Sequence, residues 1–200
     1  MRCFVVTNPV SMDINIIKTI NKDDYVIAVD SALLFCHNNN IKVDLAIGDF
    51  DSLKDHSLLN EYSFLMLNKI KDQTDTLEAI KKAYQVSNDV SLIGGLGGNR
   101  IEHSIANLNL LKQFRNLTIY SLFSKCYLVE DKTTKIRFKG YVSIFPYPEA
   151  NITLEGFKYP LDHHQLDVFD SLGISNEIID EKGVITVHKG SILVIESEYD

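Results

Sequence analysis

Aspartates gather directly after short apolar runs of this chain, and carboxylates at such positions can do chemistry. The set is Asp30, Asp49, Asp51, Asp72 and Asp75. We expect the chain to be still extended from Asp49 to Asp51, which would turn both carboxylates to one side and Phe50 away into apolar packing. Crowded carboxylates repel one another unless a cation lies among them. Oxygen ligands without Cys or a His pair favour Mg²⁺, which usually binds through one or two carboxylates and substrate phosphates. The aspartates therefore predict a site for Mg²⁺ and a polyphosphate.

Each aspartate also has a plainer interpretation as a helix N-cap or a turn residue, where Asp is common for local reasons. This alternative is strongest for Asp30, because the chain from Ser31 onward looks like a helix start, and it also holds for Asp72. The coincidence of Asp49 and Asp51 with Asp75 on a neighbouring strand end favours a shared function.

A second group of chemical interest is the glycine-rich segment 94–98, which is followed by Arg100. It lacks the Gly-Lys-Ser/Thr of a P-loop and does not fit the GxGxxG pattern. Arg100 falls at the predicted start of a helix, where its guanidinium and free backbone N–H groups can both meet phosphate oxygens. His103 could add a donor one turn later, and Lys71 suits a phosphate contact. The alternative is a plain glycine turn beside solvated side chains.

Six short apolar runs alternate with helix-like segments in the first part of the chain. The runs are 3–6, 25–29, 43–47, 64–67, 90–93 and 117–120. The clearest helices are 75–86, with Thr74 as N-cap, and 100–114, with an apolar stripe of Ile101, Ile105, Leu108 and Leu111 or Phe114. This alternation predicts βαβ units and a parallel sheet with helices on both faces. Ligands of such sheets bind beyond the carboxyl ends of the strands, where the aspartates and the glycine segment fall.

After about residue 123 the helical periodicity fades, and strand-like runs follow one another too closely for crossover helices. These runs are 127–130, 135–138, 142–145, 151–154, 183–187 and 192–196, divided by glycines and prolines. We predict mainly antiparallel strands in a small sandwich or barrel, with Asp162, His163 and His164 in a surface turn. The chain thus divides into an α/β domain at 1–124, with a Rossmann-like parallel sheet, and a smaller antiparallel β-sandwich at 125–200.

Composition and charge restrict the partners. The formal net charge is −7, from 20 Lys and Arg against 27 Asp and Glu, and no basic stripe is present, so we expect no nucleic-acid partner. The first apolar run is too short for a signal peptide and no later run approaches a membrane span, so we expect no membrane association. Cys3, Cys36 and Cys126 lie far apart and form no CxxC motif, which fits reduced thiols in the cytoplasm.

Three ordered motifs of this chain resemble those of the bacterial thiamine pyrophosphokinases. They are Ile-Gly-Asp-Phe-Asp-Ser at 47–52, Lys-Asp-Gln-Thr-Asp at 71–75 and Gly-Gly-Asn-Arg-Ile-Glu-His at 97–103. The segments 154–161, 173–177 and 190–197 resemble the C-terminal half of that family, so the similarity covers nearly the whole chain in the right order. It implies an α/β domain followed by a β-sandwich, and a homodimer whose active sites lie between the α/β domain of one subunit and the sandwich of the other.

The resemblance also implies the reaction ATP + thiamine → thiamine diphosphate + AMP, with Mg²⁺ as cofactor. By motif position, Asp49, Asp51 and Asp75 hold Mg²⁺, and Arg100 joins them as a catalytic residue. The residues implied at the nucleotide are Asp30, Lys71, Gln73, Thr74, Asp75, Arg100, Glu102 and His103. Ser175 and Asn176 are implied to face thiamine.

Two positions depart from the family pattern. Glu102 stands where the family usually has Asp, and Ser31 follows Asp30 where the family usually has Gly. Three other functions stay open at this point: a pyrophosphokinase for another primary alcohol such as a hydroxymethylpterin, a non-catalytic nucleotide or thiamine sensor, and a metal-dependent phosphatase. The phosphatase is disfavoured because 49–51 lacks a convincing nucleophile context.

Overall fold

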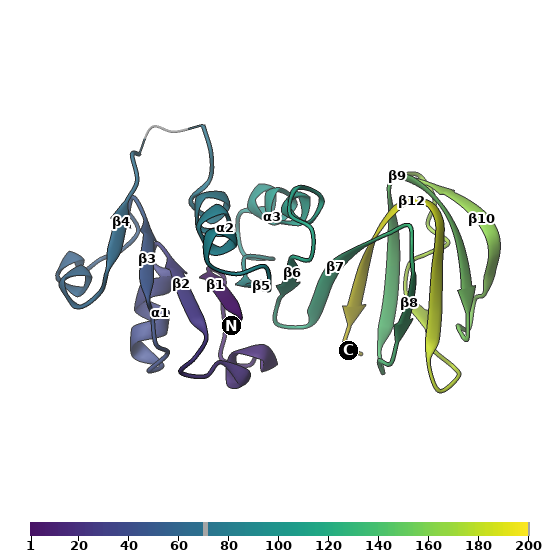
Figure 1. The fold of residues 1–200 in the computed structure, drawn as a ribbon, viewed down its shortest axis with the longest axis horizontal. Coiled ribbons are helices and arrows are strands. Elements are labelled where there is room, and N and C mark those ends of the chain that lie inside the picture. The colour runs from purple at the N-terminus through teal and green to yellow at the C-terminus, as the bar shows by residue number, and fades with distance from the viewer. Residues whose placement is uncertain (70–71, 200) are drawn as a thin grey trace. The chain divides into compact units, whose positions relative to one another are not determined.

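The structure is a computed structural model that describes residues 1–69 and 72–199. The chain divides into two compact units, Met1–Leu122 and Phe123–Asp200. All the described helices belong to the first unit, and the second is built from strands and loops (Figure 1). No helix of the described residues is long and apolar enough to cross a membrane.

The first unit contains a sheet whose strands are all parallel, with neighbours in the order β6-β5-β1-β2-β3-β4. In chain order its elements are β1 (Cys3–Thr7), the 3-10 helix η1 (Asn15–Thr19), β2 (Tyr25–Val29), α1 (Ala32–Asn38), β3 (Leu45–Gly48), the 3-10 helix η2 (His56–Glu61), β4 (Phe64–Met66), α2 (Asp75–Val86), β5 (Val90–Gly94), α3 (Ile101–Gln113) and β6 (Thr118–Tyr120). The predicted parallel α/β architecture is therefore confirmed, and the runs and helices named from the sequence end within two residues of the observed ones.

The chain reverses its direction across this sheet at β1. From β1 it moves through β2 and β3 to β4, and α2 then carries it back to β5 on the other side of β1. Parallel crossovers are right-handed, so helices before and after the reversal leave the sheet on opposite faces. The loops that follow β1 and β5 therefore diverge, which creates the crevice where ligands usually bind in open α/β sheets.

Buried side chains on both faces fix this arrangement. Phe4 and Val6 of β1 pack with Leu33 and Cys36 of α1 in one core cluster. On the opposite face of the sheet, α2 contacts β1, β2, β3 and β5 and buries Ile80. Strands covered on both faces explain why the apolar runs are continuous rather than alternating.

The two longer helices follow their predicted spans to within one residue, but of the predicted apolar stripe of α3 only Leu111 is buried. The hydroxyl of Thr74 accepts a hydrogen bond from the N–H of Leu77 at 3.2 Å, which confirms the N-cap of α2. In α3, Ile101 and Ile105 are 67% and 56% exposed. The buried residues of α3 are Ser104, Asn107, Leu110 and Leu111. The first two are polar because they meet loop backbone whose N–H and C=O groups need partners.

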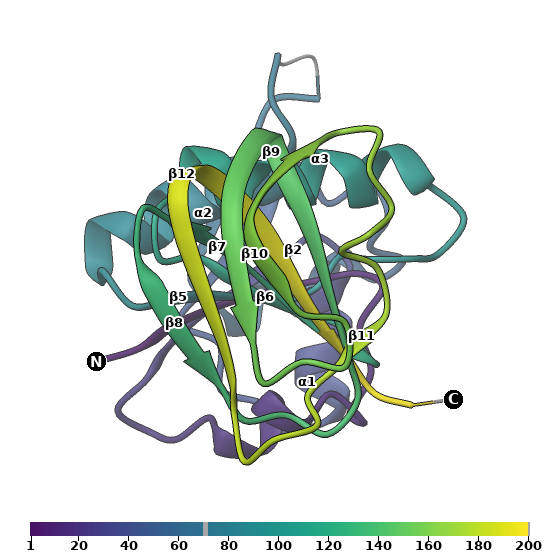
Figure 2. The same ribbon diagram turned by 90° about the vertical axis from the view of Figure 1, so that its right-hand side faces the viewer.

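The second unit is an antiparallel β domain, as predicted (Figure 2). Its strands are β7 (Ser124–Glu130), β8 (Thr133–Ile136), β9 (Tyr141–Glu155), β10 (Leu161–Asp167), β11 (Asn176–Glu177) and β12 (Gly183–Ser197). Neighbours follow the order β10-β9-β12-β7, with β11 added to β9 and β8 added to β12. The side chains of Ile144, Ile152, Ile185 and Val194 share its core.

The prolines and glycines of this domain do not end its strands at all the predicted places. The runs 142–145 and 151–154 both belong to β9, and 183–187 and 192–196 both belong to β12. Register shifts near Lys189 and Gly190 let these long strands continue through irregular pairing, and Pro146 stays paired with Ile192. The segment 162–164 lies in β10 rather than in a surface turn.

We predict that Leu92→Ala destabilises the first unit, because Leu92 of β5 is fully buried beside the strand where the chain reverses. Truncating a buried leucine leaves a cavity and costs about 2–5 kcal/mol. Urea unfolding followed by circular dichroism measures the difference in free energy. The control is Leu34→Ala on α1, a site that is 38% exposed and is expected to lose less than about 1 kcal/mol. Equal losses in the two variants would contradict the assigned core.

Candidate active site

A pocket of about 750 Å³ lies at the carboxyl edge of the sheet in the first unit. Its walls come from the segments that follow β1, β2, β3, β4 and β5, at the crevice beside β1. The structure brings together there most of the residues that the sequence singled out. Those that line the pocket are Asp30, Asp49, Gln73, Thr74, Asp75, Arg100 and His103.

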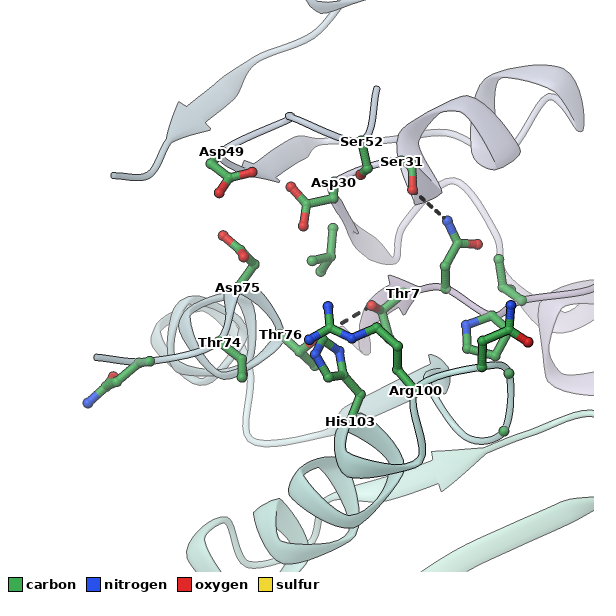
Figure 3. Close-up of a pocket in the computed structure, with 18 of the residues that line it drawn as sticks. Thr7, Asp30, Ser31, Asp49, Ser52, Thr74, Asp75, Thr76, Arg100 and His103 are labelled. Atoms are coloured by element: carbon green, nitrogen blue, oxygen red, sulfur yellow. Dashed lines mark hydrogen bonds between the residues drawn. The ribbon is translucent and has the colours of Figure 1, made fainter. Parts of the chain in front are cut away.

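Three carboxylates form an acidic wall of the pocket. Asp30 follows β2, Asp49 follows β3, and Asp75 is the first residue of α2. Figure 3 shows their side chains turned toward one common space. Because β2 and β3 are neighbouring parallel strands and α2 begins at the same edge, the topology of the sheet is what gathers them.

The turn through Phe50 is not extended, which corrects the expected orientation of the aspartates on either side of it. Phe50 has a φ of 55°, in the left-handed region that bulky residues rarely adopt. Its ring is fully buried, as predicted, and packs edge-to-face on Phe64 with centroids 6.2 Å apart. The N–H of Asp51 turns back and donates to the Asp49 carboxylate at 3.1 Å. Asp51 is consequently exposed and lies outside the pocket lining, while Asp49 faces the pocket.

The sequence supports Asp30 least as a functional residue, yet a hydrogen bond holds its carboxylate in place. It accepts a hydrogen bond from the N–H of Phe50 at 3.1 Å, and Asp30 itself has a φ of 48°. Gly48 permits this approach, because a Cβ at that position would lie 1.9 Å from the Oδ1 atom of Asp30. A glycine at the end of β3, directly before Asp49, was the signal in the sequence that could have revealed the contact.

A cationic side chain faces the acidic wall from the start of α3. Arg100 is the N-cap residue of α3, and Figure 3 shows it beside His103 in the pocket. Its Nε donates to Glu102 at 2.8 Å, and this hydrogen bond holds the pKa of the Glu102 carboxyl below its usual range. Glu102 does not line the pocket. In this structure its partner is Arg100, and its contact with a nucleotide stays a prediction.

The glycine segment is held from outside the pocket by two side chains of α3. All four glycines of 94–98 have a φ between 74° and 86°, and fixing a residue's backbone costs about 1–2 kcal/mol. The Ser104 hydroxyl accepts a hydrogen bond from the N–H of Gly97 at 2.9 Å. Asn107 Nδ2 donates to the carbonyl oxygen of Gly95 at 2.8 Å. The sequence reasoning missed both residues because it sought an apolar face on this helix.

A further wall, which sequence reasoning also missed, follows β1. Asn8 and Ser31 both line the pocket, and Asn8 Nδ2 donates to the Ser31 hydroxyl at 2.9 Å. Deeper in the pocket, the hydroxyls of Thr7 and Thr76 lie 3.4 Å apart. The position of segment 7–10 at the end of the central strand was the available signal, because ligands bind at that edge.

The residues that precede α2 are already engaged with the protein. Thr74 caps α2 through its hydroxyl, and the side-chain oxygen of Gln73 accepts a hydrogen bond from Lys81. Both residues still line the pocket. Lys71, a predicted phosphate contact, lies outside the described residues.

The two predicted thiamine contacts belong to the second unit, and their surroundings differ. Ser175 is exposed, has a φ of 54°, and donates its N–H to the Ser143 hydroxyl at 3.0 Å. Asn176 is fully buried. Its amide accepts from the N–H of Tyr159 at 3.1 Å and donates to the Tyr159 carbonyl at 2.8 Å. The Asn176 side chain thus bonds to backbone in this structure, and its contact with a substrate stays a prediction.

The acidic wall fits a hard divalent cation that is shared with a phosphate ligand. Asp30, Asp49 and Asp75 offer only oxygen donors to the pocket, which is the donor chemistry of Mg²⁺. Among the residues that the structure describes, no three His, Cys, Asp or Glu side chains gather closely enough to hold a metal ion. Mg²⁺ commonly takes one or two carboxylates and completes its shell with water and substrate phosphates. The residues present therefore fit Mg²⁺ bound together with a polyphosphate.

Comparisons with known proteins show to which family the chain is similar. Residues 16–121 match the family model described as thiamin pyrophosphokinase, catalytic domain, and residues 129–192 match thiamin pyrophosphokinase, vitamin B1 binding domain. Thiamine pyrophosphokinase of Bacillus subtilis is 30% identical over 165 residues, which cover 76% of this chain and 77% of that protein.

Solved structures give the same result for the whole chain. The crystal structure of thiamine pyrophosphokinase from Bacillus subtilis aligns with a TM-score of 0.87 at 25% identity, covering 99% of both chains. A thiamin pyrophosphokinase family protein from Enterococcus faecalis aligns with a TM-score of 0.85 at 26% identity, covering 100% of both. With its acidic and cationic pocket walls and matches to both family models, the chain belongs to the thiamin pyrophosphokinase family.

Proposed function

We propose that this protein transfers the pyrophosphoryl group of ATP to the primary hydroxyl of thiamine, giving thiamine diphosphate and AMP. The observation that carries this proposal is a single pocket in which Asp30, Asp49 and Asp75 face Arg100. A polyphosphate needs a cation against its negative charge, and a guanidinium supplies directed hydrogen bonds to its oxygens. Membership of the family supports thiamine as the acceptor.

The reaction exchanges one phosphorus–oxygen bond for another. The hydroxyl oxygen of thiamine bonds to the β-phosphorus of ATP, and the bond from that phosphorus to the α–β bridging oxygen breaks. AMP leaves with the charge of that oxygen, and the proton of the hydroxyl passes to solvent water. Such a transfer asks the protein mainly for positioning and for stabilisation of charge on phosphate oxygens.

Arg100 is the residue that we assign to the phosphate oxygens. Its side chain is 68% exposed and is paired with Glu102, itself 61% exposed, so the pair is weakly held and can exchange for a phosphate. Arginine suits this role because its planar fork matches two phosphate oxygens at once. The neighbouring backbone of Gly97 and Gly98 lines the same wall. His103, Gln73 and Thr74 are proposed as further nucleotide contacts, and Lys71 remains a predicted one.

The acidic wall is assigned to Mg²⁺. We propose Asp49, Asp51 and Asp75 as its ligands and add Asp30, whose carboxylate shares the pocket with two of them. When bound, Mg²⁺ would offset the negative charge of the phosphate oxygens. Asp51 lies outside the pocket lining, so its part requires the turn at Phe50 to change.

We also propose roles for the two units and for their assembly. We propose that residues 1–124 bind ATP and Mg²⁺, and that 125–200 bind thiamine and form a homodimer. Of the two predicted thiamine contacts, Ser175 is exposed and could reach a ligand directly. Asn176 would instead position the Tyr159 backbone, to which its amide is hydrogen-bonded. The three cysteines are buried free thiols, which suits a reducing compartment such as the cytoplasm.

The acceptor is tested by measuring AMP release from ATP and Mg²⁺ with thiamine, with a hydroxymethylpterin, or with no alcohol. We expect AMP and thiamine diphosphate in equal amounts, and only with thiamine. AMP formed with the pterin alone would identify another pyrophosphokinase. Ligand-induced stabilisation without any AMP would identify a sensor, and release of orthophosphate would identify a phosphatase.

The acidic wall is tested with Asp49→Asn and Asp75→Asn, which keep the side-chain shape and remove the charge. We expect each variant to lower kcat/KM on the order of 100-fold, because Mg²⁺ loses an anionic ligand and the polyphosphate that it binds is positioned less well. Asp51→Asn is expected to lose less, since Asp51 does not line the pocket. Steady-state AMP release measures all three. The control is Asp23→Asn, an exposed aspartate outside the pocket, and near-normal turnover by both pocket variants would refute the metal assignment.

The phosphate assignment is tested with Arg100→Ala and Arg100→Lys. We expect Arg100→Ala to raise KM for ATP about tenfold or more, because a charge-assisted hydrogen bond is lost, and Arg100→Lys to recover only part of it. The matched control is Arg137→Ala in the second unit. Arg137 is also 68% exposed and paired with a glutamate, at 3.0 Å, so it reports the effect of losing a surface ion pair alone. Equal effects at the two arginines would contradict the assignment.

A further inference from the structure

Two buried polar residues of α3 are hydrogen-bonded to the backbone of the glycine segment 94–98. Ser104 and Asn107 are only 6% and 5% exposed, and neither lines the pocket. Polar side chains at such positions are unfavourable unless they are hydrogen-bonded. Both of them use backbone of the glycine segment as their partner. The buried face of α3 is therefore specialised for contact with this loop.

The contacts fix the loop at successive points. Ser104 accepts from the N–H of Gly97 at 2.9 Å, and its hydroxyl lies 3.5 Å from the Gly97 carbonyl oxygen. Asn107 donates to the Gly95 carbonyl at 2.8 Å, while the Gly95 N–H donates to the Pro9 carbonyl at 3.1 Å. A Cβ on Gly95 would lie 2.6 Å from Asn107 Nδ2, so the fit excludes any larger residue there.

The same contacts determine where Arg100 lies. Arg100 is three residues beyond Gly97 and directly precedes the first residue of α3, and Ser104 follows one turn into the helix. The Ser104–Gly97 hydrogen bond therefore closes a small loop that contains Arg100. With this bond broken, glycines that adopt many backbone conformations would leave the position of the guanidinium less defined.

We propose that Ser104 and Asn107 are positioning residues that pre-organise the glycine segment and Arg100 for the phosphates of the nucleotide. They act through Gly97 and Gly95 and touch no substrate. The alternative is that they only satisfy buried backbone and stabilise the fold. The proposal rests on the proposed function for the identity of the nucleotide, so its test measures nucleotide affinity apart from turnover.

The first measurement is the affinity of Ser104→Ala for ATP in the presence of Mg²⁺ and without thiamine, by titration calorimetry. We expect the Kd to rise about tenfold, since small displacements of binding groups have large effects. Ser104→Thr keeps the hydroxyl and is expected to restore the affinity. Asn107→Asp replaces the donor by an acceptor facing the Gly95 carbonyl, and it is expected to weaken binding in the same way. If Ser104→Ala does not fold, Asn107→Asp decides the outcome.

A double-mutant cycle separates positioning from simple stabilisation. If Ser104 acts through Arg100, Ser104→Ala should weaken ATP binding about tenfold in the wild type but less than about twofold in the Arg100→Ala background. The same factor in both backgrounds would overturn the proposal. So would a lowered melting temperature combined with an unchanged Kd for ATP.

The matched control is Ser191→Ala in the second unit. Ser191 is 2% exposed and its hydroxyl donates to the Tyr147 carbonyl at 3.2 Å, so this variant loses a buried serine hydrogen bond far along the chain from the glycine segment. We expect a stability loss like that of Ser104→Ala with the Kd for ATP unchanged, and an equal rise in Kd would overturn the proposal. ATP binding without thiamine-dependent AMP release by the wild type would refute the proposed function and leave the positioning result standing.

Discussion

The carboxyl ends of parallel strands all lie at one edge of a sheet, and the pocket depends on this constraint. β1, β2, β3 and β5 run in the same direction, so the segments that follow them all begin at one edge of the sheet although they are far apart in the chain. The reversal at β1 opens a crevice at this edge, because the helices on its two sides leave the sheet on opposite faces. The chemical character of each pocket wall is therefore set by the few residues that follow one strand.

Those few residues give the pocket walls of opposite charge. Asp30, Asp49, Asp75 and Arg100 line one pocket of about 750 Å³. Arg100 also donates to Glu102, which does not line the pocket. A polyphosphate with its cation fits such a space, since its oxygens satisfy the guanidinium and its metal satisfies the carboxylates. The charge pattern thus favours a charged ligand complex over an apolar one.

Local backbone preferences are overridden around the pocket. Phe50 and Asp30 both adopt left-handed conformations that cost on the order of 1–3 kcal/mol each, and they contact one another through the Phe50 N–H. Burial of the Phe50 ring stabilises this arrangement. The glycine segment shows the opposite case, in which permissive backbone is restrained by Ser104 and Asn107. The strained turn at Phe50 and the restrained glycine segment thus both hold polar groups in place at this edge of the sheet.

The sequence by itself determined the parallel α/β unit, the antiparallel unit and the edge where the pocket lies, because apolar runs and helix periodicity report which faces are buried. It also predicted the N-cap at Thr74, since capping is local. Only the tertiary structure decided that Asp51 lies outside the pocket, that α3 buries Ser104 and Asn107, and that the buried Asn176 amide bonds to backbone. The physical reason is that side-chain direction at a turn and the partners of a buried polar group depend on residues distant in the chain, which no local pattern records.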